Sequence, residues 1–222
     1  MRWCVVRVLG LGMAQRERGH DHVIKVVVIG ESGVGKTSLV AKLREEAFVE
    51  DRSSTIGAEL FPLTVAVHGV GGTEGVPRRV KCSIWDTAGQ EKFRSLTGAF
   101  YRGAQLVLFC FDMTDKSSFE KIQFWFDDLI SSPSLSYPNI VKLLIGTKLD
   151  MPRVVERQDA LDLAAANDCV CYLETSSKTG SGVKECFEHG VCCVLKVPEL
   201  CETSVPLPLR SALRSEESTP CC

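Results

Sequence analysis

A glycine-rich stretch near the start of the chain ends in a lysine and a threonine. Gly30, Gly35, Lys36 and Thr37 match the spacing G-x-x-x-x-G-K-[ST]. In that pattern the glycines let backbone N–H groups converge on one anion, the lysine neutralises the β- and γ-phosphates, and the threonine hydroxyl is offered to Mg²⁺. A helix that starts there directs its positive end at the same phosphates. The spacing predicts a nucleotide phosphate site made by Gly30, Glu31, Ser32, Gly33, Val34, Gly35, Lys36, Thr37 and Ser38.

Further polar segments stand where a sheet would bring them to the same edge. Thr55 lies in a polar loop over 48–57 that has no strong period, which is typical of a mobile loop. Asp86 ends an apolar run, where a carboxylate can hold a metal-bound water that faces the phosphates. The segments 147–150 (TKLD) and 175–178 (TSSK) follow later strands, at the edge where parallel sheets bind ligands.

Strand-like and helical patterns alternate along most of the chain. Apolar and β-branched runs predict strands over 24–29, 60–68, 80–85, 106–111, 140–145 and 170–174. Helical spacing predicts helices over 36–46, 119–129, 157–167 and 183–194. Ser117 and Glu120 predict a capping box before the second helix, and a glycine-rich connection over 69–79 joins the second and third strands as a hairpin. The pattern predicts an α/β fold: a mostly parallel six-stranded sheet with one antiparallel edge hairpin and helices on both faces.

The composition favours one folded domain between two tails. The chain has 222 residues, 45% of them hydrophobic, and a formal net charge of −2, which gives no basic field for nucleic acid. We place the domain at 23–197, after a disordered or extended arm (1–22) and before a disordered tail (198–222). A signal peptide, or a start upstream of Met13, would also explain the apolar beginning. Eleven cysteines without a C-x-x-C pair, and only four histidines, favour reduced thiols in the cytosol over zinc or a disulfide framework.

The motifs stand in the order found in the small Ras-like GTPases. The phrases STIGAEL, IWDTAGQEKFRSLT, FYRGAQ and ETSSKTG, with the final Cys-Cys pair, resemble the Rab branch of that family. The resemblance spans about 23–197 and resumes at the last two residues. It implies the P-loop NTPase fold of a small G domain. It also implies a molecular switch that binds GTP or GDP with Mg²⁺, hydrolyses GTP slowly and recruits effectors to membranes in vesicle trafficking.

On the phosphate side, the resemblance implies a role for each matched residue. Lys36 contacts the β- and γ-phosphates, the N–H of Gly89 senses the γ-phosphate, and Gln90 orients the attacking water. Because no arginine occupies an obvious finger position, we expect slow hydrolysis that an activating protein accelerates by lending the missing charge. The implied metal-site residues are Thr37 and Thr55, which contact Mg²⁺, and Asp86, which holds a metal-bound water. The implied catalytic residues are Lys36, Thr55 and Gln90.

On the base side, the resemblance implies a guanine pocket, which distinguishes GTP from ATP. Asp150 accepts two hydrogen bonds from the guanine edge, and Lys148 and Phe48 flank the base. The backbone of Ser177 meets the guanine oxygen. The residues implied from the two later segments are Thr147, Lys148, Asp150, Ser176, Ser177 and Lys178.

Three features depart from the Rab pattern. Thr147 stands where most Rabs have asparagine; we expect guanine binding to survive, with different contacts from this position. Leu60 stands where Rabs usually have an aromatic residue, beside Trp85 and Phe100 in the surface that effectors recognise. The connection over 69–79 is unusually long, and a tolerated insertion explains it. For these reasons no subfamily, organelle or effector is assigned.

The final Cys221-Cys222 pair resembles the double geranylgeranylation signal of Rabs. The tail has no polybasic segment, and one lipid alone binds a membrane only marginally, which favours two lipids. Two exposed thiols at a chain end are the alternative. The resemblance implies an anchor on the cytosolic face of an endomembrane, and as partners an exchange factor, a GTPase-activating protein, a GDP-dissociation inhibitor or escort protein, and effectors.

Two other functions fit part of the pattern. A nucleotide-locked binding module would dock partners without ever cycling, and Thr147 keeps that hypothesis open. An unrelated P-loop ATPase or kinase would share the phosphate site, but Asp150 argues against it. The nucleotide recovered from purified protein distinguishes a nucleotide-locked module from a cycling GTPase. Competition of GDP against ATP for the site distinguishes an ATPase or kinase from a GTPase.

Overall fold

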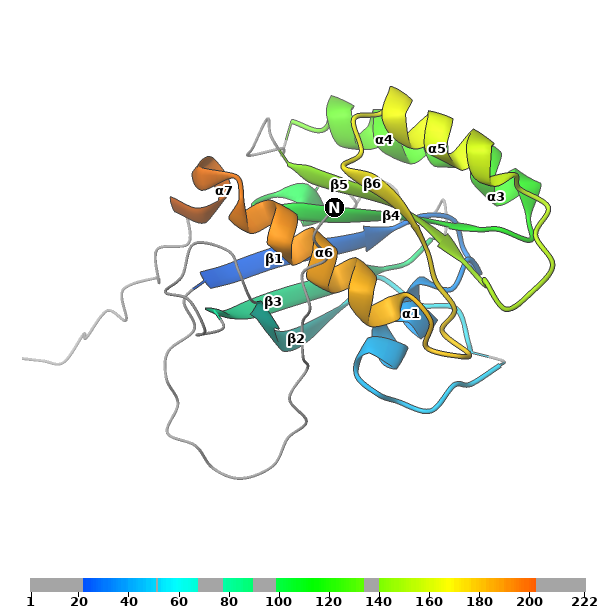
Figure 1. The fold of residues 1–222 in the computed structure, drawn as a ribbon, viewed down its shortest axis with the longest axis horizontal. Coiled ribbons are helices and arrows are strands. Elements are labelled where there is room, and N and C mark those ends of the chain that lie inside the picture. Colours follow the sequence, from blue (N-terminus) through cyan, green and yellow to red (C-terminus); the bar gives the residue numbers. More distant parts are fainter. Residues whose placement is uncertain (1–21, 51, 68–77, 90–98, 134–139, 203–222) are drawn as a thin grey trace, which may run out of the picture.

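The computed structural model describes residues 22–50, 52–67, 78–89, 99–133 and 140–202. Its strands and helices alternate as the sequence pattern predicts (Figure 1). The elements are β1 (His22–Ile29), α1 (Lys36–Leu43), β2 (Ala58–Val67), β3 (Arg78–Thr87), β4 (Leu106–Asp112), α3 (Lys116–Glu120), α4 (Ile122–Ser131), β5 (Val141–Thr147), α5 (Arg157–Ala166), β6 (Cys171–Glu174), α6 (Val183–Leu195) and α7 (Pro198–Glu202).

The six strands form one sheet in the order β2-β3-β1-β4-β5-β6. β2 and β3 pair antiparallel, from Ala58 opposite Thr87 to Val67 opposite Arg78, and every other neighbouring pair is parallel. The predicted hairpin at one edge is therefore confirmed, although most of its connection lies outside the described residues. The parallel strands all end at the same edge, which is where the phosphate loop and the other predicted segments begin.

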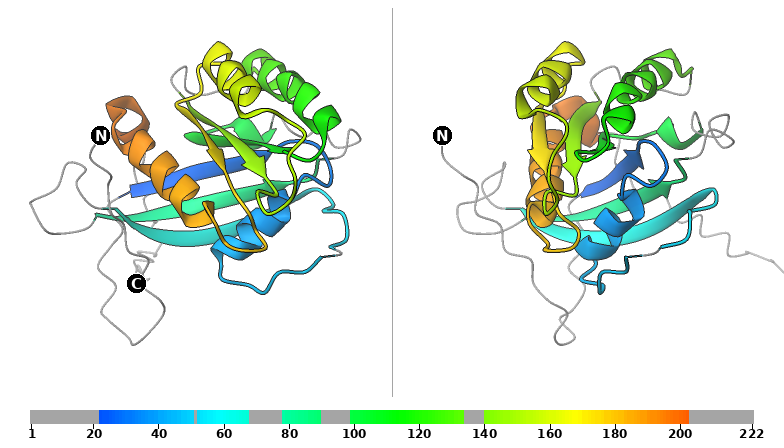
Figure 2. Two further views of the ribbon diagram at one scale, coloured as in Figure 1. Left: turned by 45° about the vertical axis from the view of Figure 1, so that its right-hand side comes forward. Right: turned by 90° about the vertical axis from the view of Figure 1, so that its right-hand side faces the viewer.

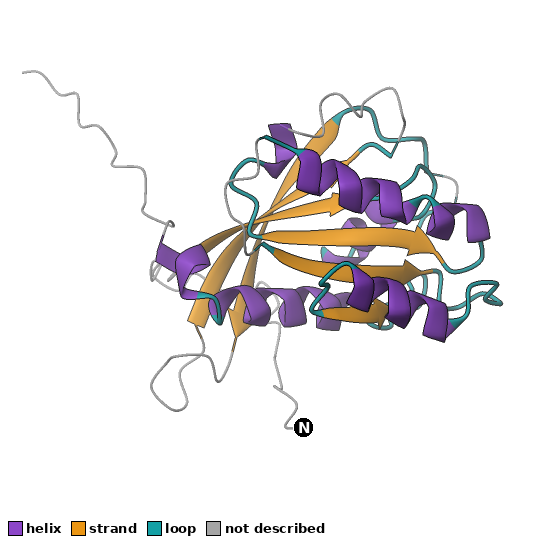
Figure 3. Ribbon diagram, turned by 90° about the horizontal axis from the view of Figure 1, so that it is seen from above, coloured by secondary structure: helices purple, strands orange, loops and turns teal. Residues whose placement is uncertain are grey.

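Helices cover both faces of the sheet (Figures 1, 2 and 3). In β1, Val26 and Val28 pack into the cluster that contains α1 and α6, whereas Val27 and Ile29 pack into the cluster with α4 and α5. Every residue of β4 is buried, because the central strand is covered on both sides. Burial of the sheet on both faces confirms the mostly parallel α/β fold that the uninterrupted apolar runs predict.

The structure corrects two predicted boundaries. The expected capping box at Ser117 is wrong: α3 begins at Lys116, and the side chain of Asp115 accepts the N–H of Ser117 at 2.9 Å. Asp and Ser are both good N-cap residues, so the sequence alone does not decide between neighbouring positions.

The second correction concerns the tail that we expected to begin at residue 198. Pro198–Glu202 instead form α7, which follows directly on the end of α6 (Figure 2). Leu200 is wholly buried, and its carbonyl accepts a hydrogen bond from the buried side chain of Gln105 at 2.5 Å. Proline suits the first position of a helix, and one buried leucine anchors the turn. The arm over 1–21 and the tail after residue 202 lie outside the described residues. Among the helices that the structure describes, none is long and apolar enough to cross a membrane.

Candidate functional site

The predicted site segments surround one cavity of about 240 Å³ at the carboxyl edge of the parallel strands. It is lined by parts of the phosphate loop, the loop that contains Thr55, and the loops after β3, β5 and β6. The predicted residues that line it are Ser32, Gly33, Gly35, Lys36, Thr37, Ser38, Phe48, Thr55, Gly89, Thr147, Lys148, Asp150, Ser177 and Lys178. The predicted residues behind this lining are Gly30, Glu31, Val34, Asp86 and Ser176, while Gln90 lies outside the described residues.

The phosphate loop is closed by the lysine at its end. The Nζ atom of Lys36 donates to the carbonyl oxygens of Gly30 at 2.8 Å and Glu31 at 2.7 Å. An ammonium has three donors, so one N–H is left for a ligand in the cavity. Lys36 is only 5% exposed, and this burial lowers its pKa, an effect that the nearby carboxylate of Asp86 opposes. An anion in the cavity would stabilise this buried cation.

Gly30 occupies a position that no other residue fits. Its φ is +143°, and a Cβ there would lie 2.1 Å from the carbonyl oxygen of Cys110 in β4. The close approach lets the loop turn sharply out of β1 over the end of β4. The glycine in the sequence pattern is thus explained by steric contact, in addition to any role in binding.

Two hydroxyls and a carboxylate meet at the base of the cavity. Thr37 Oγ1 donates to Asp86 Oδ2 at 2.5 Å and lies 2.7 Å from Thr55 Oγ1. Asp86 is fully buried, and its other oxygen, Oδ1, has no hydrogen-bond partner among the described residues. Burial raises the pKa of Asp86, since an ionised carboxylate there lacks solvation. A divalent cation would offset the buried negative charge on that oxygen. Because Mg²⁺ prefers oxygen ligands, Thr37, Thr55 and Asp86 fit the predicted metal site.

Gly89 packs directly against the phosphate loop. A Cβ on Gly89 would lie 2.4 Å from the backbone of Glu31 and Ser32. One residue earlier, the N–H of Ala88 donates to the carbonyl of Gly57 at 2.8 Å. The segment after β3 therefore contacts both the phosphate loop and the end of the loop that contains Thr55.

The side chain of Glu31 points away from the phosphates. Its Oε1 accepts from the indole N–H of Trp125 at 3.2 Å, and its Oε2 lies 3.6 Å from the ammonium of Lys121. Only the backbone of Glu31 is then available to a phosphate. The sequence pattern identifies the position but not this contact with α4.

Thr147 connects the base side of the site to the phosphate side. Its hydroxyl lies 2.6 Å from the carbonyl of Val34 and 2.9 Å from that of Phe111, and it can donate its single proton only to these acceptors. The side chain is 2% exposed. Thr147 therefore fixes the phosphate loop to the end of β4 and keeps no proton for a bound base.

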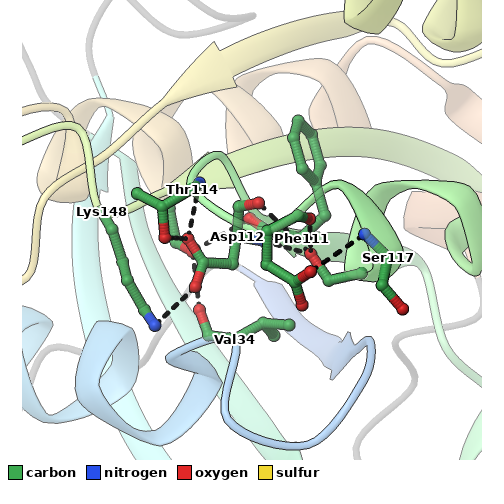
Figure 4. Close-up of polar contacts among 9 residues, drawn as sticks. Val34, Phe111, Asp112, Thr114, Ser117 and Lys148 are labelled. Atoms are coloured by element: carbon green, nitrogen blue, oxygen red, sulfur yellow. Dashed lines mark hydrogen bonds and ion pairs between the residues drawn. The ribbon is translucent and has the colours of Figure 1, made fainter. Parts of the chain in front are cut away.

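Lys148 is held by a buried carboxylate at the end of β4. Its Nζ lies 2.5 Å from Asp112 Oδ2, and Asp112 Oδ1 accepts from the N–H and hydroxyl of Thr114 at 2.8 and 2.7 Å (Figure 4). Lys148 has a φ of +60°, a left-handed conformation that is unfavourable for lysine. The sequence identifies Lys148 but not its partner Asp112.

Asp150 is oriented by the segment after β6. Ser176 Oγ donates to Asp150 Oδ1 at 2.5 Å and accepts the N–H of Thr179 at 3.1 Å. The N–H of Leu149 donates to the carbonyl of Thr175 at 3.0 Å, which joins the two loops. Asp150 Oδ2 remains for a ligand in the cavity that this residue lines.

Comparison with known proteins identifies the family. A sequence model of the Ras family matches residues 25–196. The chain belongs to the Ras family of small GTPases. It is 38% identical over 184 residues to the Ras-related protein Rab-18 of Caenorhabditis elegans, which covers 82% of this chain and 85% of that one. It is also 38% identical over 183 residues to Rab-18-B of Danio rerio (82% and 84% covered) and over 172 residues to Rab-13 of Canis lupus familiaris (77% and 79%).

These relatives confirm the predicted Rab resemblance. The chain is a Rab-type GTPase with the small G domain of the P-loop NTPases, and its enzyme class is GTP hydrolysis. Members of this family bind GTP or GDP, and the Rab relatives support a small GTPase involved in membrane trafficking. The individual residue roles within this Rab-type site stay predictions.

The cavity also holds residues that the sequence patterns did not select, namely Glu50, Arg52, Ser53, Ser54, Thr87 and Met151. Several of them lie in the polar loop around Thr55, where no period marks which side chains turn inward. Arg52 had one available signal: it stands three residues before a predicted metal ligand.

Proposed function

We propose that this Rab-type protein is a switch that hydrolyses GTP slowly and recruits effectors while it holds GTP. The observation that carries the proposal is the contact between Thr37, Thr55 and the buried Asp86, one oxygen of which has no hydrogen-bond partner among the described residues. Thr55 lies 18 residues after Thr37, in a loop without regular structure. A cation and phosphate at this point would hold that loop in one position.

Each residue of the phosphate site has a physical task in hydrolysis. Lys36 neutralises phosphate charge with its remaining N–H, and Thr37, Thr55 and Asp86 would hold Mg²⁺, which offsets the negative charge on the β- and γ-phosphates when bound. We assign Gln90 to the orientation of the water that attacks the γ-phosphorus. The γ-phosphate leaves as inorganic phosphate, and GDP stays in the cavity.

The base side supports selection of guanine. Asp150 is held by Ser176 and lines the cavity, where its carboxylate would accept the two N–H groups of a guanine edge. Phe48 and Lys148 line the same cavity and would flank the base. Adenine has no matching donors, which disfavours ATP.

We assign effector recognition to the exposed surface of the β2–β3 hairpin. Leu60 is 49% exposed and pairs with Trp85, whose ring centroid lies 5.7 Å from that of Phe100. The hairpin continues directly from the loop of Thr55 and into the segment of Gly89, so nucleotide state would reach it from both ends. Exchange factors, activating proteins and an escort protein or GDP-dissociation inhibitor would act on the same cycle.

We place the protein on the cytosolic face of an endomembrane, in vesicle trafficking, with geranylgeranyl groups on Cys221 and Cys222. These cysteines lie outside the described residues. Expression of tagged protein with and without the two residues tests the anchor. The full chain is expected on membranes and the truncated chain in the cytosol, and a truncated chain that stays on membranes would contradict the assignment.

The nucleotide cycle is tested with purified protein. We expect bound GDP on isolation, displacement by GTP but not ATP, and measurable single-turnover hydrolysis that Gln90→Leu slows strongly. A variant that hydrolyses GTP as fast as the parent would remove the role of Gln90. Persistent unhydrolysed GTP, or no nucleotide, would favour the alternative of a nucleotide-locked scaffold that docks partners without cycling.

A further inference from the structure

Arg52 brings a second positive charge, besides that of Lys36, to the phosphate side of the cavity. It lines the same cavity as Lys36, Thr37 and Thr55. Its side chain is 27% exposed, and its Nε–H is buried without a hydrogen-bond partner among the described residues. A guanidinium is always charged and carries five N–H donors, so a planar anion with several oxygens is the ligand that satisfies it best.

The present partner of Arg52 is a weak one. Arg52 Nη2 lies 3.6 Å from Glu46 Oε2, whereas the other oxygen of that carboxylate is held by Arg44 at 2.9 Å. Both side chains of the Arg52–Glu46 pair are partly exposed, and long exposed pairs contribute little stability. Glu46 therefore keeps Arg52 near the cavity without fixing it there.

The position of Arg52 relative to Thr55 decides which phosphate it can reach. Thr55 Oγ1 lies 2.7 Å from Thr37 Oγ1, at the predicted metal site, where the β- and γ-phosphates of a bound nucleotide would lie. Three residues of chain span at most about 10 Å, so the backbone of Arg52 stays close to that site when Thr55 is engaged.

We propose that Arg52 supplies, within this chain, the positive charge that stabilises the transition state of GTP hydrolysis. As the water oxygen bonds to the γ-phosphorus, the bond to the β–γ bridging oxygen breaks and its electron pair goes to the β-phosphate. One proton of the water stays on the new P–OH group and the other passes to an oxygen of the departing phosphate. Arg52 leaves Glu46 and donates N–H groups to these oxygens, and it neither gains nor loses a proton. G-protein α subunits use an arginine in cis in this way, whereas Ras receives one from an activating protein.

This inference rests on the proposed GTPase function and changes one expectation from the sequence. We expected that no arginine of the chain occupies a finger position. The structure places Arg52 in the cavity, and we infer that its charge raises the intrinsic rate above that of a GTPase without such a residue. Hydrolysis with an arginine in cis is still slow, about 10⁻² per second in Gα, so the protein remains a switch.

The test uses a transition-state analogue in addition to the reaction. Full-length protein is loaded with fluorescent mant-GDP and Mg²⁺, and aluminium fluoride is added without any activating protein. We expect the wild type to bind the fluoride complex, seen as a fluorescence change and as bound ¹⁹F resonances. Arg52→Ala is expected to weaken this binding about tenfold or more and to slow single-turnover GTP hydrolysis about twentyfold. Arg52→Lys keeps a point charge and should recover part of both effects.

Matched controls separate charge from folding. Arg44→Ala removes the other arginine on Glu46 and should bind aluminium fluoride like the wild type, and mant-GDP affinity should be similar in all variants. The proposal is overturned if the wild type does not bind aluminium fluoride, or if Arg52→Ala binds it equally well, while both bind mant-GDP. If the wild type fails to bind mant-GDP, the proposed GTPase function fails, and this inference fails with it.

Discussion

The ion pair between Asp112 and Lys148 links a buried carboxylate of β4 to the side chain that we expect to flank guanine. Asp112→Asn removes the negative charge and keeps the shape. Its amide oxygen can still accept from Thr114, but its NH₂ group then faces the ammonium of Lys148. We expect Lys148 to lose its orientation and GDP to dissociate faster.

The magnitude follows from the burial of the two partners. The side chain of Asp112 is 8% exposed and that of Lys148 36% exposed, so the pair lies between a surface ion pair and a buried one. Surface pairs contribute about 0–1 kcal/mol and breaking a buried pair costs about 3–5 kcal/mol, whereas one hydrogen bond to a charged group contributes about 1.5–3 kcal/mol. We take the ion pair to contribute about 3 kcal/mol, of which half serves to orient Lys148 over the base. Loss of that half weakens GDP binding by about 1.5 kcal/mol, so the dissociation rate of GDP rises about tenfold.

The assay is release of mant-GDP into excess unlabelled GDP at constant Mg²⁺. Thr114→Val is the matched control, because it removes one hydrogen bond to the other oxygen of Asp112 and leaves the carboxylate and the ion pair in place. Dissociation from Asp112→Asn within about twofold of the wild type would refute the reasoning, as would an equal effect of Thr114→Val.

Three further predictions concern other parts of the site and the fold. Gly89→Ala places a methyl group 2.4 Å from the backbone of Glu31 and Ser32. We therefore expect GTP affinity to fall about tenfold relative to GDP affinity in mant-nucleotide competition. An unchanged ratio of the two affinities would contradict a γ-phosphate contact by this segment. Thr147→Val removes the hydroxyl between the carbonyls of Val34 and Phe111. Urea unfolding with GDP should show that the free energy of unfolding falls by about 1–3 kcal/mol. A fall of only about a few tenths of a kcal/mol would show that the two carbonyls find other donors. Burial, with the nearby Lys196, lowers the pKa of His189 below its ordinary value near 6.5. Its neutral form therefore favours folding above that value, and thermal stability should decline as pH falls from 7.5 to 5.5. His189→Gln should reduce this decline, and an unchanged decline would assign it to other groups.

The sequence predicts the fold well because its strongest signals are physical requirements of the sheet. A strand covered on both faces needs a continuous apolar run, and 106–111 is such a run, which the structure extends only to Asp112. The predicted residues of the phosphate loop, 147–150 and 175–178 meet at one edge because parallel strands all end there.

The sequence misses features that depend on contacts between distant segments. Arg52 lines the cavity from a loop with no period, so its one signal in the sequence is its place three residues before Thr55. Leu200 lies among residues that resemble a tail, and only the distant side chain of Gln105 makes its helix part of the domain. The sequence identifies Thr147 as a departure from a motif. Only the fold brings its hydroxyl within hydrogen-bond distance of the carbonyl oxygens of Val34 and Phe111.

The phosphate loop and the loop of Thr55 differ in how firmly the rest of the domain holds them. The phosphate loop is fixed through Lys36, through Thr147 from β5, and through its own Glu31, whose side chain accepts from Trp125 of α4. Thr55, by contrast, has one hydrogen bond in the described part of the chain, to Thr37, and its neighbour Ile56 is 83% exposed. Segments with few internal contacts open at low free-energy cost, so a ligand that binds Thr55 changes this loop and leaves the phosphate loop in place. A γ-phosphate bound at Thr55 would thus act on the less constrained side of the cavity, which is the arrangement that a nucleotide-dependent switch requires.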